Sequence, residues 1–287
     1  MKQVHSDVQD WIHKNQLGDI TSVDPVSGGC IHQALRIQTA SGEDFFLKQD
    51  PGKYTDVFLR EAEGLEALRI DGGPVIPEVY LVGEGYLLLS NLQPAPRCKD
   101  FWQIYGRQLA ALHMQQNPRF GFESDNYIGS NPQQNTWMEN GWEFFQEMRL
   151  RNQIKWANDR SLLDTKDLHR LEILLIRLPE LIPEQPASLI HGDLWSGNLI
   201  TNQDGKPALI DPAVYYGWAE ADLAMADLFG HYPDEFFRAY TEINPLEPGY
   251  RSRFSLYNIY HLLNHLNLFG RDIDPVSGLS WIIFQPE

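Results

Sequence analysis

Two short stretches in the second half of the chain contain residues whose types and spacing suit phosphoryl transfer. Residues 190–199 read IHGDLWSGNL, and residues 208–212 read ALIDP. Four residues separate Asp193 from Asn198, which is the spacing of the catalytic Asp and the metal-binding Asn in kinases. A second carboxylate, Asp211, ends an apolar run with the pattern of a strand. These residues predict phosphoryl transfer from magnesium-bound ATP.

Each of the three side chains has a role in that chemistry. We expect Asp193 to orient the acceptor hydroxyl group and accept its proton. Asn198 and Asp211 would supply the hard oxygen ligands that Mg²⁺ prefers. Taken singly, such residues often only close turns, but their combination favours catalysis. Pro212 and Ala213 stand where protein kinases have Phe-Gly, so the Phe-based switch of those enzymes is absent.

The N-terminal third contains candidates for binding the nucleotide. Lys48 ends an apolar strand, where its ammonium group can pair with phosphate oxygens, and Glu61 on the next predicted helix is placed to hold it. Gly28 and Gly29, within SGGCI at residues 27–31, suit a hairpin whose backbone N–H groups cover phosphates, although paired glycines also make ordinary turns. No Gly-Lys-Ser/Thr follows, which excludes a Walker A loop.

The order of predicted elements indicates an α+β fold with two lobes. The smaller lobe, residues 1–92, has a leading helix within residues 1–18, an antiparallel sheet and one main helix. The expected strands lie at 34–38, 44–48, 79–82 and 86–89, and the main helix at 56–68. A stiff break at 93–96 then leads into the larger lobe, residues 93–287, which is mainly helical. The larger lobe would be catalytic and substrate-binding, with the nucleotide between the lobes. Its helices are expected at 100–113, 141–157, 165–178, 220–229, 234–241 and 251–269.

Residues around these stretches are candidates for supporting roles. Ser90, Asn91 and Leu92 end the last strand of the smaller lobe, where a kinase hinge contacts adenine through backbone groups. Asp222 can cap a predicted helix or bond the backbone of the Asp193 segment, and both alternatives stay open.

Four residues are candidates for contacting the acceptor. Trp195 and Trp218 can pack on sugar C–H groups or attract a protonated amine. His261 and His265 share a face of the helix predicted at 251–269. For Trp218 we favour core packing slightly over contact with the acceptor, and buried, satisfied polar groups explain the two histidines at least as well as a binding role does.

Bulk composition excludes several other classes of function. The net charge of −16 would repel a phosphate backbone, so we expect no nucleic-acid partner. No apolar run is long enough to span a bilayer, and the polar N-terminus lacks the core of a signal peptide. Cys30 and Cys98 make no disulfide framework, so a reducing cytoplasm is expected. Cys30 is either an ordinary thiol or an oxidisable one that controls access of ATP.

Several motifs together resemble the fructosamine kinase, or ketosamine-3-kinase, family. They are SGGCI (27–31), FLK (46–48), EAEGLEAL (61–68), HGDLWSGN (191–198), DPA (211–213), YG (216–217), EADLAM (220–225), LFG (228–230) and HLLNHLNLFG (261–270). The HGDLW variant and the late His-Asn helix are specific to that family. The HGD core alone is shared with aminoglycoside and choline kinases.

The resemblance implies a protein-kinase-like fold and ATP-dependent phosphorylation of the 3-hydroxyl group of a ketosamine, the Amadori product of a sugar and an amine. The 3-phosphate promotes elimination, so the implied role is deglycation of amines. Asp193 corresponds to the proton acceptor and residues 90–92 to the hinge, where other members have Glu in place of Ser90. The resemblance decides neither between fructosamine and ribulosamine nor between free and protein-bound acceptors.

Two alternatives to a ketosamine kinase remain. One is a kinase of the same fold that acts on another amino sugar or amino alcohol. The other is a catalytically silent nucleotide-binding protein, which the presence of Asp193, Asn198, Asp211 and Lys48 disfavours.

Overall fold

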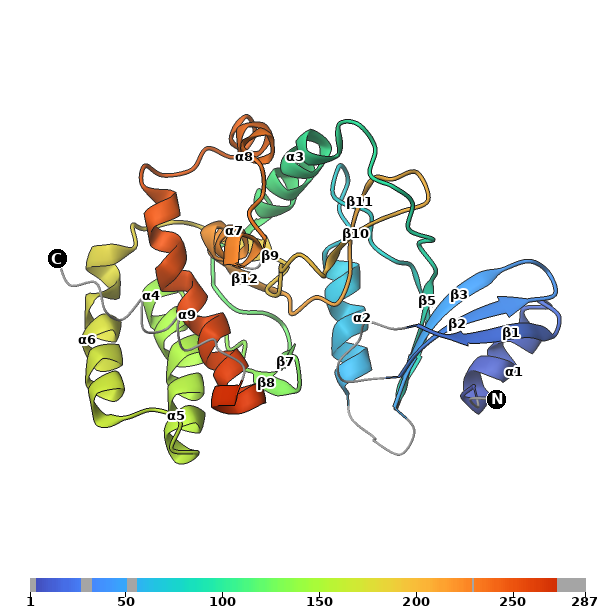
Figure 1. Cartoon of the computed structure of the whole chain (residues 1–287), viewed down its shortest axis with the longest axis horizontal. Helices are drawn as coiled ribbons and strands as arrows, with labels where there is room; N and C mark the ends of the chain where they lie inside the picture. The colour runs from blue at the N-terminus through green and yellow to red at the C-terminus, as the bar shows by residue number, and fades with distance from the viewer. Residues whose placement is uncertain (1–3, 27–32, 51–55, 229, 273–287) are drawn as a thin grey trace. The chain divides into compact units, whose positions relative to one another are not determined.

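The computed structural model describes residues 4–26, 33–50, 56–228 and 230–272 (Figure 1). The chain forms two compact units, one of residues 1–101 with 199–211 and one of residues 102–198 with 212–287. The first unit extends past Leu92, the last residue of the predicted smaller lobe, and includes part of the second half of the chain. The chain passes between the units directly after Asn198 and again directly after Asp211.

The first unit is built on a five-stranded antiparallel sheet with the strand order β1-β2-β3-β5-β4. The strands are β1 (Ile20–Pro25), β2 (Gln33–Thr39), β3 (Asp44–Gln49), β4 (Val79–Gly83) and β5 (Tyr86–Ser90). The four predicted strands are confirmed, and β1 is an addition. The main helix predicted at 56–68 is α2 (Val57–Ala67), which contacts β4 and β5.

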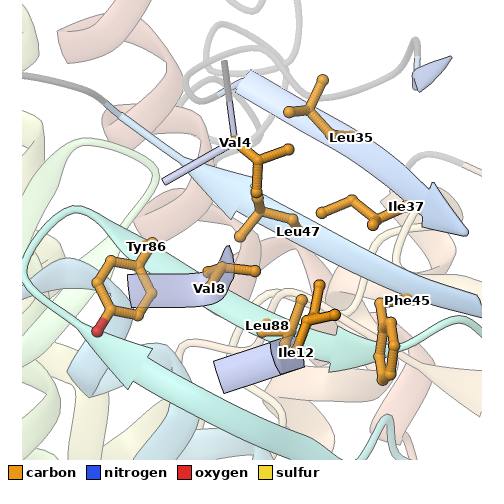
Figure 2. Packing of buried hydrophobic residues seen from close by; sticks show 9 residues of the cluster. All are labelled: Val4, Val8, Ile12, Leu35, Ile37, Phe45, Leu47, Tyr86 and Leu88. Carbon is orange, nitrogen blue, oxygen red and sulfur yellow. The ribbon is translucent and has the colours of Figure 1, made fainter. Parts of the chain in front are cut away.

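One face of this sheet is covered by α1 (Ser6–Lys14), the predicted leading helix. Successive side chains of a strand point to opposite faces, so every second residue reaches this face. Figure 2 shows the resulting core of Val4, Val8, Ile12, Leu35, Ile37, Phe45, Leu47, Tyr86 and Leu88. Lys48 follows Leu47 and therefore projects from the other face.

A hairpin of β10 (Leu199–Thr201) and β11 (Pro207–Leu209) belongs to the same unit. Ala208 forms a parallel bridge with Val75, and the Thr201 hydroxyl group donates to the carbonyl oxygen of Ala95 at 2.6 Å. These bonds fix the backbone that leads to Asp211.

The second unit is mainly helical, as the sequence predicts. Its helices are α3 (Phe101–His113), α4 (Gly141–Phe144), α5 (Asn152–Asp159), α6 (Thr165–Leu181), α7 (Ala219–Leu228), α8 (Asp234–Thr241) and α9 (Tyr250–Phe269), with a 3₁₀ turn at Gly270–Asp272. The single helix predicted at 141–157 is observed as α4 and α5 joined by a π-helical segment, Phe145–Arg151. The spacing of apolar residues predicts a helix of period 3.6 and does not distinguish a short π-helical segment within it, so the sequence did not predict this segment.

Short strands in the second unit position the catalytic stretch. A three-stranded sheet has the order β12-β9-β6, with β6 (Gln116–Asn117), β9 (Ala187–Ile190) and β12 (Tyr215–Gly217). A hairpin is formed by β7 (Asn126–Ile128) and β8 (Asn131–Gln133). β9 ends immediately before His191, so the sheet fixes the backbone that leads to the residues around Asp193.

None of the described helices combines the length and the hydropathy that a membrane-spanning helix needs.

Candidate active site

Residues 191–198 form a loop at the end of β9, which we call the catalytic loop. Gly192 has φ of +81°, and a Cβ atom there would lie 2.1 Å from the carbonyl oxygen of Ala213. Only glycine fits this close approach of two backbone segments. The amide Nδ2 of Asn198 donates to the Asp193 carbonyl oxygen at 2.8 Å and to carboxylate Oδ2 at 3.3 Å. The structure therefore brings the predicted base and one predicted metal ligand together.

A buried carboxylate holds the backbone of the catalytic loop. Asp222 accepts the N–H groups of His191 at 2.6 Å and Gly192 at 2.9 Å. Burial favours a higher pKa for Asp222, but His113, His191 and the Gly192 N–H together hold that pKa below its ordinary value. Asp222 is thus ionised at neutral pH. Of the two roles that the sequence left open, bonding to the loop backbone is confirmed.

His113, at the end of α3, supports Asp222 and was not identified from the sequence. Its Nε2 lies 3.3 Å from Asp222 Oδ2, and its Nδ1 lies 2.7 Å from the hydroxyl oxygen of Tyr240. Asn244 Nδ2 donates to the same hydroxyl oxygen at 2.9 Å. Because the ionised carboxylate of Asp222 can only accept, Nε2–H of His113 is the donor of the bond between them. A single His at a helix end gives no local signal of this role.

The first unit brings together Lys48, Glu61 and Asp211. Lys48 Nζ lies 2.6 Å from Glu61 Oε1 and 2.5 Å from Asp211 Oδ1. Burial alone would lower the pKa of Lys48, but the two carboxylates raise it above its ordinary value, so the ammonium group stays charged. Burial raises the pKa of Glu61, against the opposing effect of Lys48. The predicted pairing of Lys48 with Glu61 is observed, and its contact with Asp211 is additional.

Asp211 has an unusual backbone conformation for a residue with a side chain. Its φ is +55°, in the left-handed region that costs of order 1 kcal/mol for most residues other than glycine. Its side chain is 43% exposed, although it lies beside the nearly buried Lys48. Strained conformations of this kind concentrate at functional sites, where the surrounding structure maintains them.

The donor atoms of Asn198 and Asp211 suit Mg²⁺. Because Asn198 Nδ2 is directed to Asp193, Oδ1 is the atom of that amide that can ligate a metal. Among the described residues, no three His, Cys, Asp or Glu side chains form a metal-binding group. A magnesium ion bound with a nucleotide needs only one or two carboxylates besides phosphates and water, so a small oxygen donor set fits it.

Of the residues predicted to contact the nucleotide through the glycine hairpin and the hinge, the structure describes only those of the hinge. Gly28 and Gly29 lie outside the described residues, as does Cys30. Ser90 ends β5, and its N–H and hydroxyl groups are both bonded to the backbone of Glu78 at 2.9 Å. The N–H group of Asn91 also has a backbone partner, the carbonyl oxygen of Asp44 at 3.4 Å. The hinge role of Ser90, Asn91 and Leu92 therefore remains a prediction.

The two tryptophans proposed to contact the acceptor lie in different environments. Trp195 is 40% exposed, and its indole ring covers Gly197, where a Cβ atom would lie 2.2 Å from the ring. It presents an aromatic face in the same loop as Asp193. Trp218 is 4% exposed and packs among other aromatic rings. Those rings belong to Phe120, Phe145 and Tyr257, with centroids 5.6 to 5.9 Å away. This environment favours the packing alternative for Trp218.

The two histidines of α9 differ in their exposure to solvent. His261 is 5% exposed and lies beside the ring of Tyr260, whereas His265 is half-buried beside Phe269. Burial lowers the pKa of His261 to about 3 and also lowers the pKa of His265. Both rings are therefore neutral near pH 7, and contact with the acceptor remains a prediction for each.

The low pKa of His261 makes stability depend on pH. The unfolded chain binds a proton on this ring below about pH 6.5, but the folded chain does not until about pH 3. Stability is thus lost as the pH falls through this window, by at most about 1.4 kcal/mol per pH unit. Between about pH 7 and about pH 5, we expect wild type to lose about 2 kcal/mol more unfolding free energy than His261→Asn.

Denaturant unfolding at the two pH values measures this difference. His169→Asn, which changes an exposed histidine of α6, is the matched control and should keep the wild-type pH dependence. An equal loss of stability in wild type and His261→Asn would contradict the assignment of a neutral, buried His261.

A family model and individual relatives all relate this chain to the same protein family. A family model described as fructosamine kinase matches residues 3–275. A "probable ketoamine kinase" from Synechocystis sp. is 40% identical over 253 residues, which cover 85% of this chain and 84% of that protein. A "protein-ribulosamine 3-kinase, chloroplastic" from Arabidopsis thaliana is 37% identical over 274 residues, covering 92% and 82%.

Among solved structures, a "putative fructosamine-3-kinase" from Thermobifida fusca YX-ER1 is 32% identical, with a TM-score of 0.88 and 98% of each chain covered. The expected α+β, protein-kinase-like fold is confirmed. The match extends over nearly the whole chain, as the distribution of the sequence motifs indicated. The chain therefore belongs to the fructosamine kinase family.

Proposed function

We propose that this chain transfers the γ-phosphoryl group of ATP to the 3-hydroxyl group of a ketosamine and so initiates deglycation of an amine. It is an ATP-dependent phosphotransferase with an alcohol group as acceptor, in keeping with its family and with relatives named ketoamine kinase and ribulosamine 3-kinase. The observation that supports this proposal most strongly is the catalytic loop. In it, Asp193 is bonded to Asn198 and follows a backbone fixed by Asp222.

The observed hydrogen bonds support the proposed phosphate-binding and catalytic roles. Asp193 accepts the proton of the acceptor hydroxyl group, and its bond from Asn198 orients the carboxylate. Lys48 uses two of its three N–H donors on Glu61 and Asp211, so the third can bind a phosphate oxygen. Asn198 Oδ1 and Asp211 would hold Mg²⁺, which when bound neutralises charge on the phosphate oxygens.

The remaining assignments rest on the sequence together with exposure. Residues 1–92 form the nucleotide-binding lobe, with Gly28, Gly29 and the backbone of residues 90–92 as contacts. Residues 93–287 form the catalytic and substrate-binding lobe. Trp195 offers an exposed ring for the sugar or for a protonated amine. We place the activity in the cytoplasm, because Cys30 and Cys98 provide no disulfide framework.

Asp193→Ala tests the proposed base. Removing the carboxylate should lower kcat by roughly 10²–10⁴ and leave nucleotide affinity within about twofold, because the proton acceptor acts in the transition state. Steady-state kinetics and calorimetric titration with ATP measure the two quantities. Asp204→Ala, in the exposed turn between β10 and β11, is the matched control and should keep wild-type kcat. Near-normal turnover by Asp193→Ala would remove this residue from the mechanism.

A substrate panel tests the acceptor. We expect turnover of fructosyl-lysine and ribulosyl-lysine with ATP and little turnover of choline or kanamycin. The ³¹P and ¹H NMR spectra of the product should place the phosphate on C3 of the sugar. Faster phosphorylation of choline or kanamycin than of either ketosamine would favour a kinase of the same fold with another acceptor. A phosphate on another carbon would contradict the proposed chemistry.

A further inference from the structure

Buried amide side chains of the second unit bind the backbone segment that follows Asp211. Asn126 Nδ2 donates to the carbonyl oxygen of Val214 at 2.8 Å, and Gln133 Nε2 donates to that of Ala213 at 3.0 Å. Both amides belong to the β7–β8 hairpin and are almost inaccessible to solvent. A buried carbonyl oxygen needs such a donor, and two adjacent carbonyl groups here receive one from side chains rather than from a neighbouring strand.

The orientation of Asn126 is fixed by its other bonds. Its Oδ1 accepts hydrogen bonds from Gln133 Nε2 at 2.7 Å and from Asn135 Nδ2 at 3.0 Å. With two donors on the oxygen, the amide nitrogen must face Val214. Asn135 is in turn held by Arg149, whose Nη2 donates to Asn135 Oδ1 at 2.6 Å.

Arg149 is the most unusual member of this network. It lies in the π-helical segment and is fully buried. Its described partners are the carbonyl oxygens of Gln134 and Met148 and the amide oxygen of Asn135, and none of these is a carboxylate. Its guanidinium group also lies 3.8 Å from the centroid of the Tyr215 ring, in β12. Burying a charge without a carboxylate partner is costly, and among the described residues the buried Nε of Arg149 has no hydrogen-bond partner. This cost points to a role for Arg149 beyond packing.

The same backbone segment contacts the catalytic loop on its other side. The N–H group of Ala213 donates to the carbonyl oxygen of His191 at 2.9 Å. The carbonyl oxygen of Ala213 lies so close to Gly192 that no Cβ atom fits there. Ala213 thus lies between the network and the two residues that precede Asp193, and a shift of Ala213 would move that backbone.

We infer that these four side chains are positioning residues for the catalytic loop: they hold Ala213 and Val214, and through Ala213 they fix the backbone that presents Asp193. We call them the amide clamp, and its members are Asn126, Gln133, Asn135 and Arg149. The inference rests on the proposed role of Asp193. The clamp holds the segment where protein kinases have the residues after their metal-binding Asp, and the Pro212-Ala213 sequence found here has no Phe to move.

Gln133→Met tests the clamp with little change in volume. It removes the donor to Ala213 and the acceptor that Tyr260 OH uses at 2.7 Å. We expect kcat for the ketosamine to fall about 10- to 100-fold with KM for ATP within about twofold, because a displaced base impairs the transition state and not nucleotide binding. The matched control is Gln153→Met, which removes an equally buried amide bonded to Asn264 and Asn267 and should keep kcat.

Amide hydrogen exchange provides a readout that does not depend on activity. Peptides that contain residues 191–193 and 213–214 should exchange faster in Gln133→Met than in wild type or Gln153→Met. Tyr260→Phe is a milder second variant, in case Gln133→Met does not fold, and we expect a smaller loss of kcat and faster exchange in the same peptides.

The outcomes separate this inference from the proposed function. If wild type phosphorylates no ketosamine, the proposed function fails, while the exchange measurements still test the clamp. If Asp193→Ala abolishes turnover but Gln133→Met matches Gln153→Met in both kcat and exchange, the clamp is overturned and the proposed function stands. The inference is supported if Gln133→Met and Tyr260→Phe show a lower kcat and faster amide exchange while Gln153→Met shows neither.

Discussion

The geometry of the proposed base depends on one buried, ionised carboxylate. Asp222 accepts two consecutive backbone N–H groups, from His191 and Gly192, and Asp193 is the next residue. An ionised carboxylate away from water is costly without such partners, so the loop and the carboxylate stabilise each other. His113 adds a third partner and lowers the pKa of Asp222 further. The position of Asp193 is therefore set by backbone bonds and not by contacts of its own side chain alone.

The rest of the second unit supports this interaction from two directions. His113 of α3, Tyr240 of α8 and Asn244, which follows α8, form a chain of hydrogen bonds behind Asp222. The β7–β8 hairpin and the π-helical segment hold the segment around Ala213. The first unit follows a similar principle with opposite charge, since the nearly buried Lys48 is held by two carboxylates that maintain its ammonium form. In each unit a buried charge is stabilised by several specific partners, which together fix the geometry around it.

The sequence revealed the features that have a local pattern and missed those that depend on distant contacts. Alternation and helical periodicity located most strands and helices, and motif spacing identified the Asp193–Asn198 pair and the Lys48–Glu61 pair. The roles of His113 and Arg149 could not be predicted, because their partners are distant in sequence or are backbone carbonyl groups, for which no spacing rule exists. For Trp218 and His261, residue type permitted both a binding and a packing role, and burial in the structure favours packing.

Asp222→Asn tests the central interaction most directly. The substitution keeps the shape of the side chain but places an NH₂ group against one of the two backbone N–H donors. We predict that kcat for the ketosamine falls about 100-fold or more while affinity for ATP changes less than about twofold. Asp227→Asn, on the same helix, should leave kcat unchanged. A kcat for Asp222→Asn within about threefold of wild type would show that the catalytic loop keeps its geometry without this carboxylate, and would contradict the account.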